Sequence, residues 1–64
     1  MKEQIRRLQK DGEYKFSGLT REESKQAAIK LSRAAMKDDR KHGNTSQFGI
    51  ARDAFGYYYS KAIV

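Results

Sequence analysis

The spacing of apolar residues near the start of the chain predicts a short helix. Within residues 2–10, Ile5 and Leu8 lie three positions apart, so a helix would place both side chains on one face. A helix of this length is too short to persist in water without tertiary contacts. We therefore expect it to pack against the rest of the chain.

The next segment changes from a helical to an alternating pattern. Asp11 and Gly12 form a turn signal, and the aromatic residues Tyr14 and Phe16 then alternate with polar ones. A strand shows this alternation, and its backbone groups need a partner. The pattern predicts an extended segment or short strand at residues 13–17, which would pair with the C-terminal tail or with a second copy.

The middle of the chain carries the strongest helix signals. Thr20 and Glu23 have the spacing of a capping box, and the following residues are rich in Ala, Lys and Arg, which favour helix. Acidic residues stand at the start and basic residues at the end, as the helix dipole prefers. Because Gly43 supplies a left-handed stop, the pattern predicts a helix over residues 21–42.

The C-terminal part permits two interpretations. From a cap within residues 44–46, helical spacing would gather apolar side chains into a stripe roughly 100° wide, made of Phe48, Ala51, Phe55, Tyr58, Tyr59 and Ala62. As part of this stripe, Tyr58 and Tyr59 would lie in the core, whereas Tyr57 would project away from the stripe and stand on the surface. The alternative ends the helix near Gly56 and makes residues 57–64 a strand, since Tyr, Ile and Val favour sheets. The helix is the preferred prediction.

Together these segments predict a mainly α protein with a single small domain over residues 1–64. It would contain the short N-terminal helix, the extended segment or short strand at residues 13–17, and two longer helices packed together. A chain of 64 residues buries little core, and the absence of cysteine removes disulfides. Good packing, or self-association as a homodimer, would have to supply the remaining stability.

Residues 45–63 also resemble the recognition unit of helix-turn-helix repressors, which often place a glycine four positions after an alanine. Here Gly56 follows Ala51 by five positions, and Phe55 stands where that glycine belongs. The resemblance covers under a third of the chain. It implies a recognition helix in the DNA major groove, with Tyr57, Tyr58, Ser60 and Lys61 facing the groove.

The charge balance narrows the choice of partner. Fourteen Lys and Arg stand against eight Asp and Glu, a net charge of +6, which favours nucleic acid, an acidic protein surface or an anionic membrane as partner. The predicted middle helix collects a basic stripe roughly 100° wide, made of Lys30, Arg33, Lys37, Arg40 and Lys41. Arg6 and Arg7 add a second cluster, whereas Asp38 and Asp39 dilute the stripe locally.

The basic stripe predicts a small non-enzymatic nucleic-acid-binding protein that contacts the phosphate backbone, most simply of DNA. The alternative is a protein interaction module or inhibitor, of the type found among small phage or plasmid proteins. Such a module would dock a basic surface bearing Tyr57 on an acidic target. A solvated helix face without a partner is the third interpretation.

No catalytic, metal or cofactor site is predicted. The chain has no cysteine and one histidine, His42, so Cys- and His-based metal clusters and thiol chemistry are excluded. Asp38 and Asp39 are adjacent and would point about 100° apart on a helix, which prevents convergence on a cation. No apolar leader follows Met1, and no apolar run reaches roughly 20 residues. The sequence predicts a cytoplasmic protein without a membrane partner.

Overall fold

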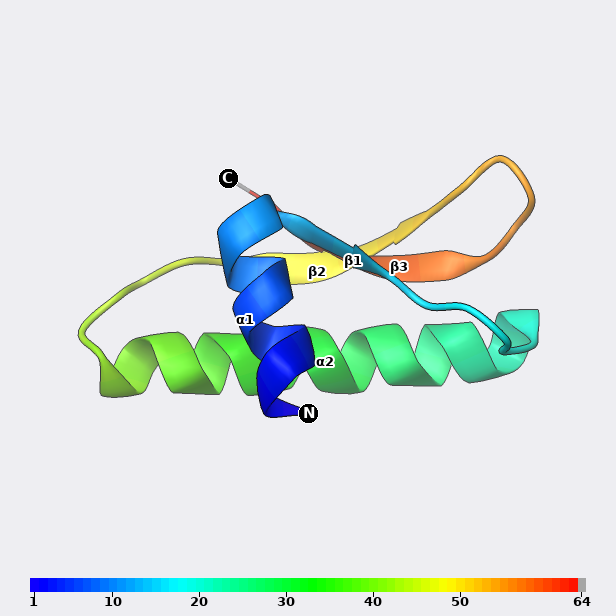
Figure 1. Cartoon of the computed structure of the whole chain (residues 1–64). Helices are drawn as coiled ribbons and strands as arrows, with labels where there is room; N and C mark the ends of the chain where they lie inside the picture. The colour runs from blue at the N-terminus through cyan, green and yellow to red at the C-terminus, as the bar shows by residue number, and fades with distance from the viewer. Residues whose placement is uncertain (64) are drawn as a thin grey trace.

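A computed structural model describes residues 1–63 as two helices and three strands arranged in two layers (Figure 1). In chain order the elements are α1 (Lys2–Asp11), β1 (Glu13–Lys15), α2 (Arg21–Lys41), β2 (Phe48–Arg52) and β3 (Tyr58–Ala62). The expected mainly α fold is therefore wrong. The protein is a small α+β protein, because the C-terminal third of the chain forms strands.

The N-terminal predictions are confirmed. The helix α1 ends at Gly12, whose φ of 79° is left-handed and whose N–H donates to the carbonyl of Leu8. The strand β1 occupies the first part of the segment predicted to be extended. Gly12 is thus the point at which the chain turns from the helix into the sheet.

The long helix α2 is also confirmed, with the predicted cap. The backbone N–H of Glu23 donates to Oγ1 of Thr20 over 3.1 Å, and the N–H of Thr20 donates to Oε1 of Glu23 over 2.9 Å. The helix ends one residue earlier than predicted, and Gly43 follows with a φ of 77°. Local signals alone were enough to place both ends of this helix.

The predicted C-terminal helix is wrong, and the resemblance to a helix-turn-helix unit ends with it. Residues 48–62 form a hairpin of β2 and β3, in which the N–H of Asp53 donates to the carbonyl of Tyr57. The alternative strand over residues 57–64 corresponds to β3, while Val64 lies outside the described residues. Aromatic residues fit both helical and strand spacing here, and in the fold β3 pairs with β2 on one side and with distant β1 on the other.

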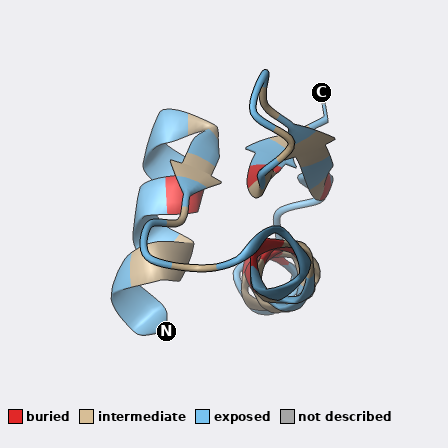
Figure 2. Ribbon diagram, turned by 90° about the vertical axis from the view of Figure 1, so that its right-hand side faces the viewer, coloured by how far each residue is buried: buried red, intermediate tan, exposed pale blue. Residues whose placement is uncertain are grey.

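The sheet is antiparallel with strand order β1-β3-β2, so the last strand lies in the middle. Ser60 is the register partner of Tyr14 on one side and of Ile50 on the other. Figure 2 shows that α2 covers one face of the sheet and that α1 lies beside α2, near β1. The other face of the sheet is open. The fold is a two-layer sandwich of helix and sheet.

The core lies between α2, α1 and the inner face of the sheet. Its buried apolar residues are Leu8, Ala28, Leu31, Ala35 and Phe48. Small residues on α2 allow the sheet to approach closely, and serines bridge the two layers. Oγ of Ser60 donates to the carbonyl of Ala28 over 2.8 Å, and Oγ of Ser32 donates to the carbonyl of Gly49 over 2.8 Å.

Candidate nucleic-acid interface

The basic stripe lies on the face of α2 that points away from the sheet. The buried residues of α2 are Ser24, Ala28, Leu31, Ser32, Ala35 and Asp39, and helical geometry places them on the side opposite the stripe. All five stripe residues are exposed. The end-on view of α2 in Figure 2 shows the buried residues turned toward the sheet. The fold therefore leaves the whole stripe available to a ligand.

The stripe is long enough to follow a phosphate backbone. From Lys30 to Lys41 the helix rises about 16 Å at roughly 1.5 Å per residue. This is close to the axial length of about five base pairs at roughly 3.4 Å each. Cations spaced three or four residues apart repeat once per helical turn and share one side of the helix. One rigid element thus presents several positive charges to the same ligand.

The acidic residues beside the stripe are turned toward α1. The side-chain amide of Gln9 donates to Oδ2 of Asp38 over 3.0 Å and to Oδ1 of Asp39 over 2.6 Å. Asp39 is buried, and the imidazole of His42 lies 3.8 Å from the carboxylate of Asp38. Hydrogen bonds from a neutral amide do not cancel the charge of a carboxylate, so the expected dilution of the stripe by these two aspartates stays a prediction.

Among residues 1–63, no stripe cation lies within 4.0 Å of a carboxylate. The ion pairs of this part of the chain are those of Arg7 with Glu3 and of His42 with Asp38. Lysine and arginine without an intramolecular partner keep their full charge for an anionic ligand. The stripe is therefore the most extended set of unpaired positive charges on one element.

The second predicted cluster, Arg6 and Arg7, is not continuous with the stripe. Both residues are exposed on α1, but Arg7 contacts Glu3 at 3.5 Å. Arg6 lines a shallow hollow together with Lys2, Ile5 and Asp38. The structure thus keeps these arginines on a separate helix, at the flank of α2.

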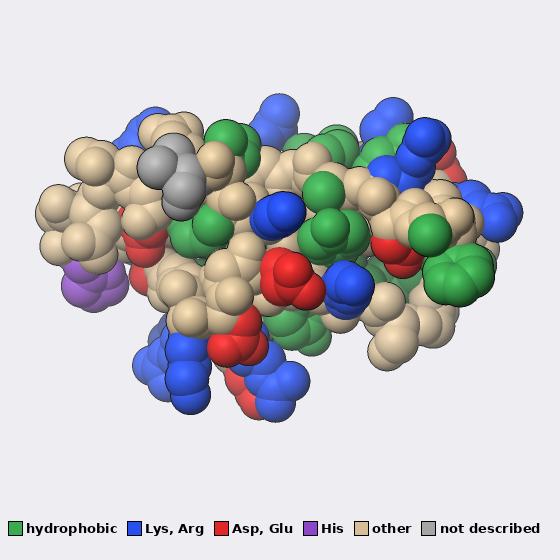
Figure 3. Space-filling model, turned by 90° about the horizontal axis from the view of Figure 1, so that it is seen from above, with side chains coloured by type: hydrophobic (Ala, Val, Ile, Leu, Met, Phe, Trp, Pro, Cys, Tyr) green, Lys and Arg blue, Asp and Glu red, His purple; other side chains and the backbone are tan. Residues whose placement is uncertain are grey.

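The open face of the sheet carries mixed chemistry. Viewed from above in Figure 3, positive side chains are scattered among acidic and apolar ones. The register places Tyr59 and Lys61 on this face, and the ammonium of Lys15 lies 5.2 Å from the centre of the Tyr59 ring. This face offers one aromatic ring with neighbouring lysines but no row of cations.

The turn between β2 and β3, residues 53–57, is a feature that the sequence analysis missed. We call it the hairpin tip. Oδ1 of Asp53 accepts the N–H groups of Phe55 and Tyr57, each over 2.9 Å, and Nε of Arg21 donates to the carbonyl of Phe55 over 3.0 Å. Gly56 adopts a left-handed φ of 87°. Asp53 and Gly56 between two alternating runs are the signal that could have revealed this turn.

The hairpin tip presents two aromatic side chains to solvent. Phe55 is 75% exposed and Tyr57 is 38% exposed. The guanidinium of Arg21 lies 5.3 Å from the centre of the Tyr57 ring. Tyr58 and Tyr59 were expected in the core of a helical pair, but both are half-buried and β3 turns them to opposite faces of the sheet. Exposed aromatic side chains of this kind can anchor a partner.

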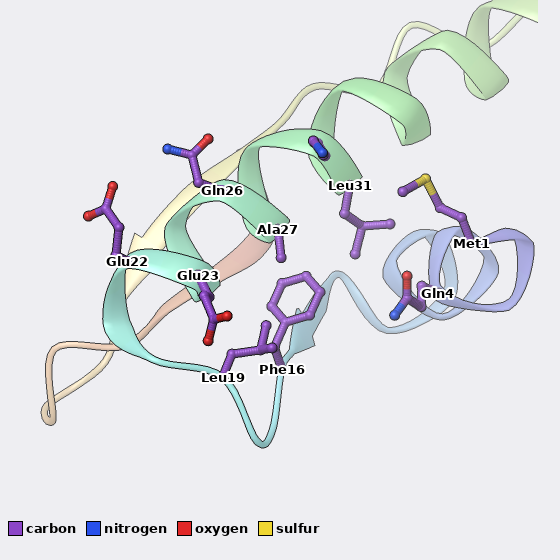
Figure 4. A pocket seen from close by; sticks show the side chains of 10 residues that line it. Met1, Gln4, Phe16, Leu19, Glu22, Glu23, Gln26, Ala27 and Leu31 are labelled. Carbon is purple, nitrogen blue, oxygen red and sulfur yellow. The ribbon is translucent and has the colours of Figure 1, made fainter.

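A hollow of about 450 Å³ lies between α1, α2 and the segment that joins β1 to α2. Figure 4 shows Phe16, Leu19 and Leu31 at its floor, with Met1 on one side. Glu22 and Gln26 form the polar rim, and Lys30 of the basic stripe also lines it. An apolar recess therefore opens beside one end of the stripe.

Searches for a metal site, a membrane-spanning helix and similar proteins complete the description of this chain. Within residues 1–63, no three or more His, Cys, Asp or Glu side chains gather as a metal site would require. Over the same range, neither helix combines the length and the apolar character needed to cross a membrane. No protein-family model, curated protein or solved structure matches this chain.

Proposed function

We propose that this protein binds nucleic acid, with duplex DNA as the first ligand to test, through the basic stripe of α2. The observation that carries the proposal is the position of the stripe, whose five cations are exposed on one rigid helix face and unpaired within residues 1–63. Such a face neutralises phosphates and releases their counterions. It requires no catalytic group, and the role is that of a non-enzymatic binding protein.

The salt dependence of binding tests this proposal. Anisotropy of a labelled mixed-sequence duplex should give a slope of log affinity against log salt of about −4 to −5, as expected for about five phosphate contacts. A labelled single strand measured in parallel should give a shallower slope of about −3 to −4 for the same number of contacts. No binding to either ligand at about 50 mM salt would contradict the proposal.

A matched pair of variants separates the stripe from the net charge. Arg33→Gln with Lys37→Gln should reduce the magnitude of the duplex slope by about 2, since each lost phosphate contact removes about one. Lys15→Gln with Lys61→Gln removes the same charge from the exposed residues of the sheet and should leave the slope nearly unchanged. Equal effects of the two double variants would show that charge acts without regard to its position.

A second candidate function rests on the hairpin tip. The backbone that carries the exposed ring of Phe55 is held in place by Asp53 and Arg21, so little backbone freedom is lost when a partner binds the ring. With arginine beside it, the tip suits an apolar pocket bordered by carboxylates on a protein. The protein interaction that the sequence predicted through Tyr57 is therefore proposed here for the hairpin tip as a whole.

The two candidates respond to different substitutions. Phe55→Ser with Tyr57→Ala should abolish the capture of a specific protein partner and leave the duplex slope intact. The stripe variant, Arg33→Gln with Lys37→Gln, should do the reverse. If the same proteins are captured with and without the aromatic residues of the hairpin tip, the second candidate is excluded.

A further inference from the structure

The outer edge of β2 has unpaired backbone groups. β2 pairs only with β3. Just before β2 the carbonyl of Gln47 accepts the N–H of Ile63, and just after β2 the N–H of Asp53 donates to the carbonyl of Tyr57. Because backbone groups alternate along a strand, the odd-numbered residues of β2 point theirs toward β3. The N–H and C=O groups of Phe48, Ile50 and Arg52 therefore point to the outer edge. No partner for them occurs within residues 1–63. A row of this kind is a template for another strand.

β2 lacks the features that usually protect an edge. Proline, a bulge or a central charge prevents edge-to-edge pairing in many proteins, but the middle residue of this strand is Ile50, which is 39% exposed. The other edge strand, β1, has three residues, of which Glu13 and Lys15 are charged. Of the two edges, that of β2 is the one suited to pairing.

The sequence of β2 is complementary to itself in the antiparallel direction. If Ile50 of two copies face each other across a twofold axis, Phe48 of each copy lies opposite Arg52 of the other. Gly49 then lies opposite Ala51 on the other face. This register uses the whole strand. It also avoids like charges directly opposite each other, an arrangement that destabilises a sheet. An isologous contact of this form closes as a dimer.

The helix layer fits the same arrangement. α2 lies beneath β2 and β3, since Ser32 donates to Gly49 and Ser60 donates to Ala28. Across the twofold axis, two such helices would be separated by about two strand spacings, or roughly 9–10 Å. Packed helices lie about 8–10 Å apart. The second copy would therefore bring its helix to packing distance without displacing the strands.

The flank of α2 next to β2 supplies apolar side chains for this contact. Ile29 lies three residues before Ser32 and Met36 lies four after it, so both share the side of the helix that contacts β2. Both are half-buried in the single chain. Ile29 follows Ala28, whose bond to Ser60 places it near the level of Ile50. Ile29 and Ile50 would be buried together at the twofold axis, and Met36 would extend the apolar contact about 10 Å further along α2.

We propose that two copies of this protein associate through their β2 edges into a dimer with a continuous six-stranded antiparallel sheet. Because opposite residues share a face, both α2 helices lie on the same side of that sheet. Lys30, Lys37 and Lys41 of each stripe face outward, whereas Arg33 and Arg40 lie beside the contact between the helices. The dimer does not depend on nucleic-acid binding. The dimer would also double the cationic surface offered to nucleic acid, and this consequence alone rests on the proposed function.

The mass of the protein in solution tests the dimer. Sedimentation equilibrium of the full chain without nucleic acid should give twice the 7.4 kDa of one chain at high concentration. Since each copy carries a charge of +6, added salt screens their repulsion and should strengthen association. Nucleic-acid binding should respond to salt in the opposite direction. A monomer at every concentration and salt level would overturn the proposal.

A matched pair of isoleucine variants places the interface. Ile50→Lys puts like charges opposite each other at the twofold axis and should produce a monomer. Ile63→Lys adds the same charge at a residue that is 67% exposed and lies outside the edge, so it should remain a dimer. Circular dichroism shows whether each variant is folded. Equal loss of dimer in both variants would place the contact elsewhere.

Cysteine cross-linking gives a second test that keeps the fold intact. The chain has no cysteine, so a single Ile50→Cys substitution can be oxidised without competing thiols. Directly opposite residues have Cα atoms about 5.5 Å apart, which lies within the range that a disulfide spans. Ile50→Cys should form a covalent dimer much faster than Phe55→Cys at the exposed hairpin tip. Equal rates would contradict the β2 contact even if a dimer forms.

Discussion

Asp53 is the residue that determines where the aromatic side chains of the hairpin tip stand. One carboxylate oxygen accepts the N–H groups of Phe55 and Tyr57, and the N–H of Asp53 itself donates to the carbonyl of Tyr57. The carbonyl of Asp53 accepts the N–H of Gly56 over 3.1 Å. A single side chain thus replaces the backbone partners that the turn residues lack.

Removing this carboxylate should destabilise the protein. Asp53→Ala leaves two backbone N–H groups without their acceptor, and we expect the free energy of unfolding to fall by about 1–2 kcal/mol. Asp11→Ala is the matched control, since Asp11 is exposed and its loss should change stability by no more than about 0.5 kcal/mol. Urea denaturation at one fixed protein concentration measures both. Similar values for the two variants would show that the turn does not depend on Asp53.

At the scale of elements, the contact between α2 and the sheet depends on small polar residues. β1 ends at Lys15, the register partner of Tyr59, so it offers no acceptor for the N–H of Tyr58. Oγ of Ser24 takes that place at 3.1 Å and itself donates to the carbonyl of Arg21. A helix side chain therefore completes the hydrogen bonding of the central strand.

This arrangement predicts different costs for two similar substitutions. Ser24→Ala leaves the half-buried N–H of Tyr58 without a partner and should lower the free energy of unfolding by about 1–3 kcal/mol. Ser32→Ala should cost less, because the carbonyl of Gly49 keeps its partner in β3. Urea denaturation gives both values, and hydrogen exchange should show faster opening at Tyr58 in the first variant alone. A larger loss for Ser32→Ala would contradict this account.

At the scale of the whole molecule, three surfaces point in different directions. The basic stripe lies on the far side of α2, the β2 edge lies at one side of the sheet, and the hairpin tip projects beyond the sheet near the start of α2 (Figure 1). A dimer through β2 would therefore leave the lysines of both stripes free, with Arg33 and Arg40 at the margin of the contact between the helices. The core is small, with five buried apolar residues, which is the situation in which a second copy adds most to stability.

The helices were predictable because their signals are local. The capping box of Thr20 and Glu23 marks the start of α2, Gly43 follows its end, and α1 ends at Gly12. Each of these signals acts over a few residues. The composition of the basic stripe followed from the helical spacing of α2 in the same way.

The C-terminal strands were not predictable by the same reasoning. Phe48 and its aromatic neighbours can be arranged as a helical stripe or as an alternating strand, and local spacing does not choose between them. The turn signal of Asp53 and Gly56 favours the hairpin of β2 and β3, and β3 also pairs with β1 from the other end of the chain. The aromatic character of Tyr57–Tyr59 was visible, but the strand turns neighbouring tyrosines to different sides.

By itself, the sequence of this protein determined both helices with their ends to within one residue, the net charge of +6 and the identity of the five cations on one helix face. Only the tertiary structure decided that this face points away from the sheet, that Asp38 and Asp39 turn toward Gln9, and that β2 keeps a free edge. Helical signals act between neighbours in the chain. Strand pairing and the partners of charged side chains depend on residues that only folding brings together.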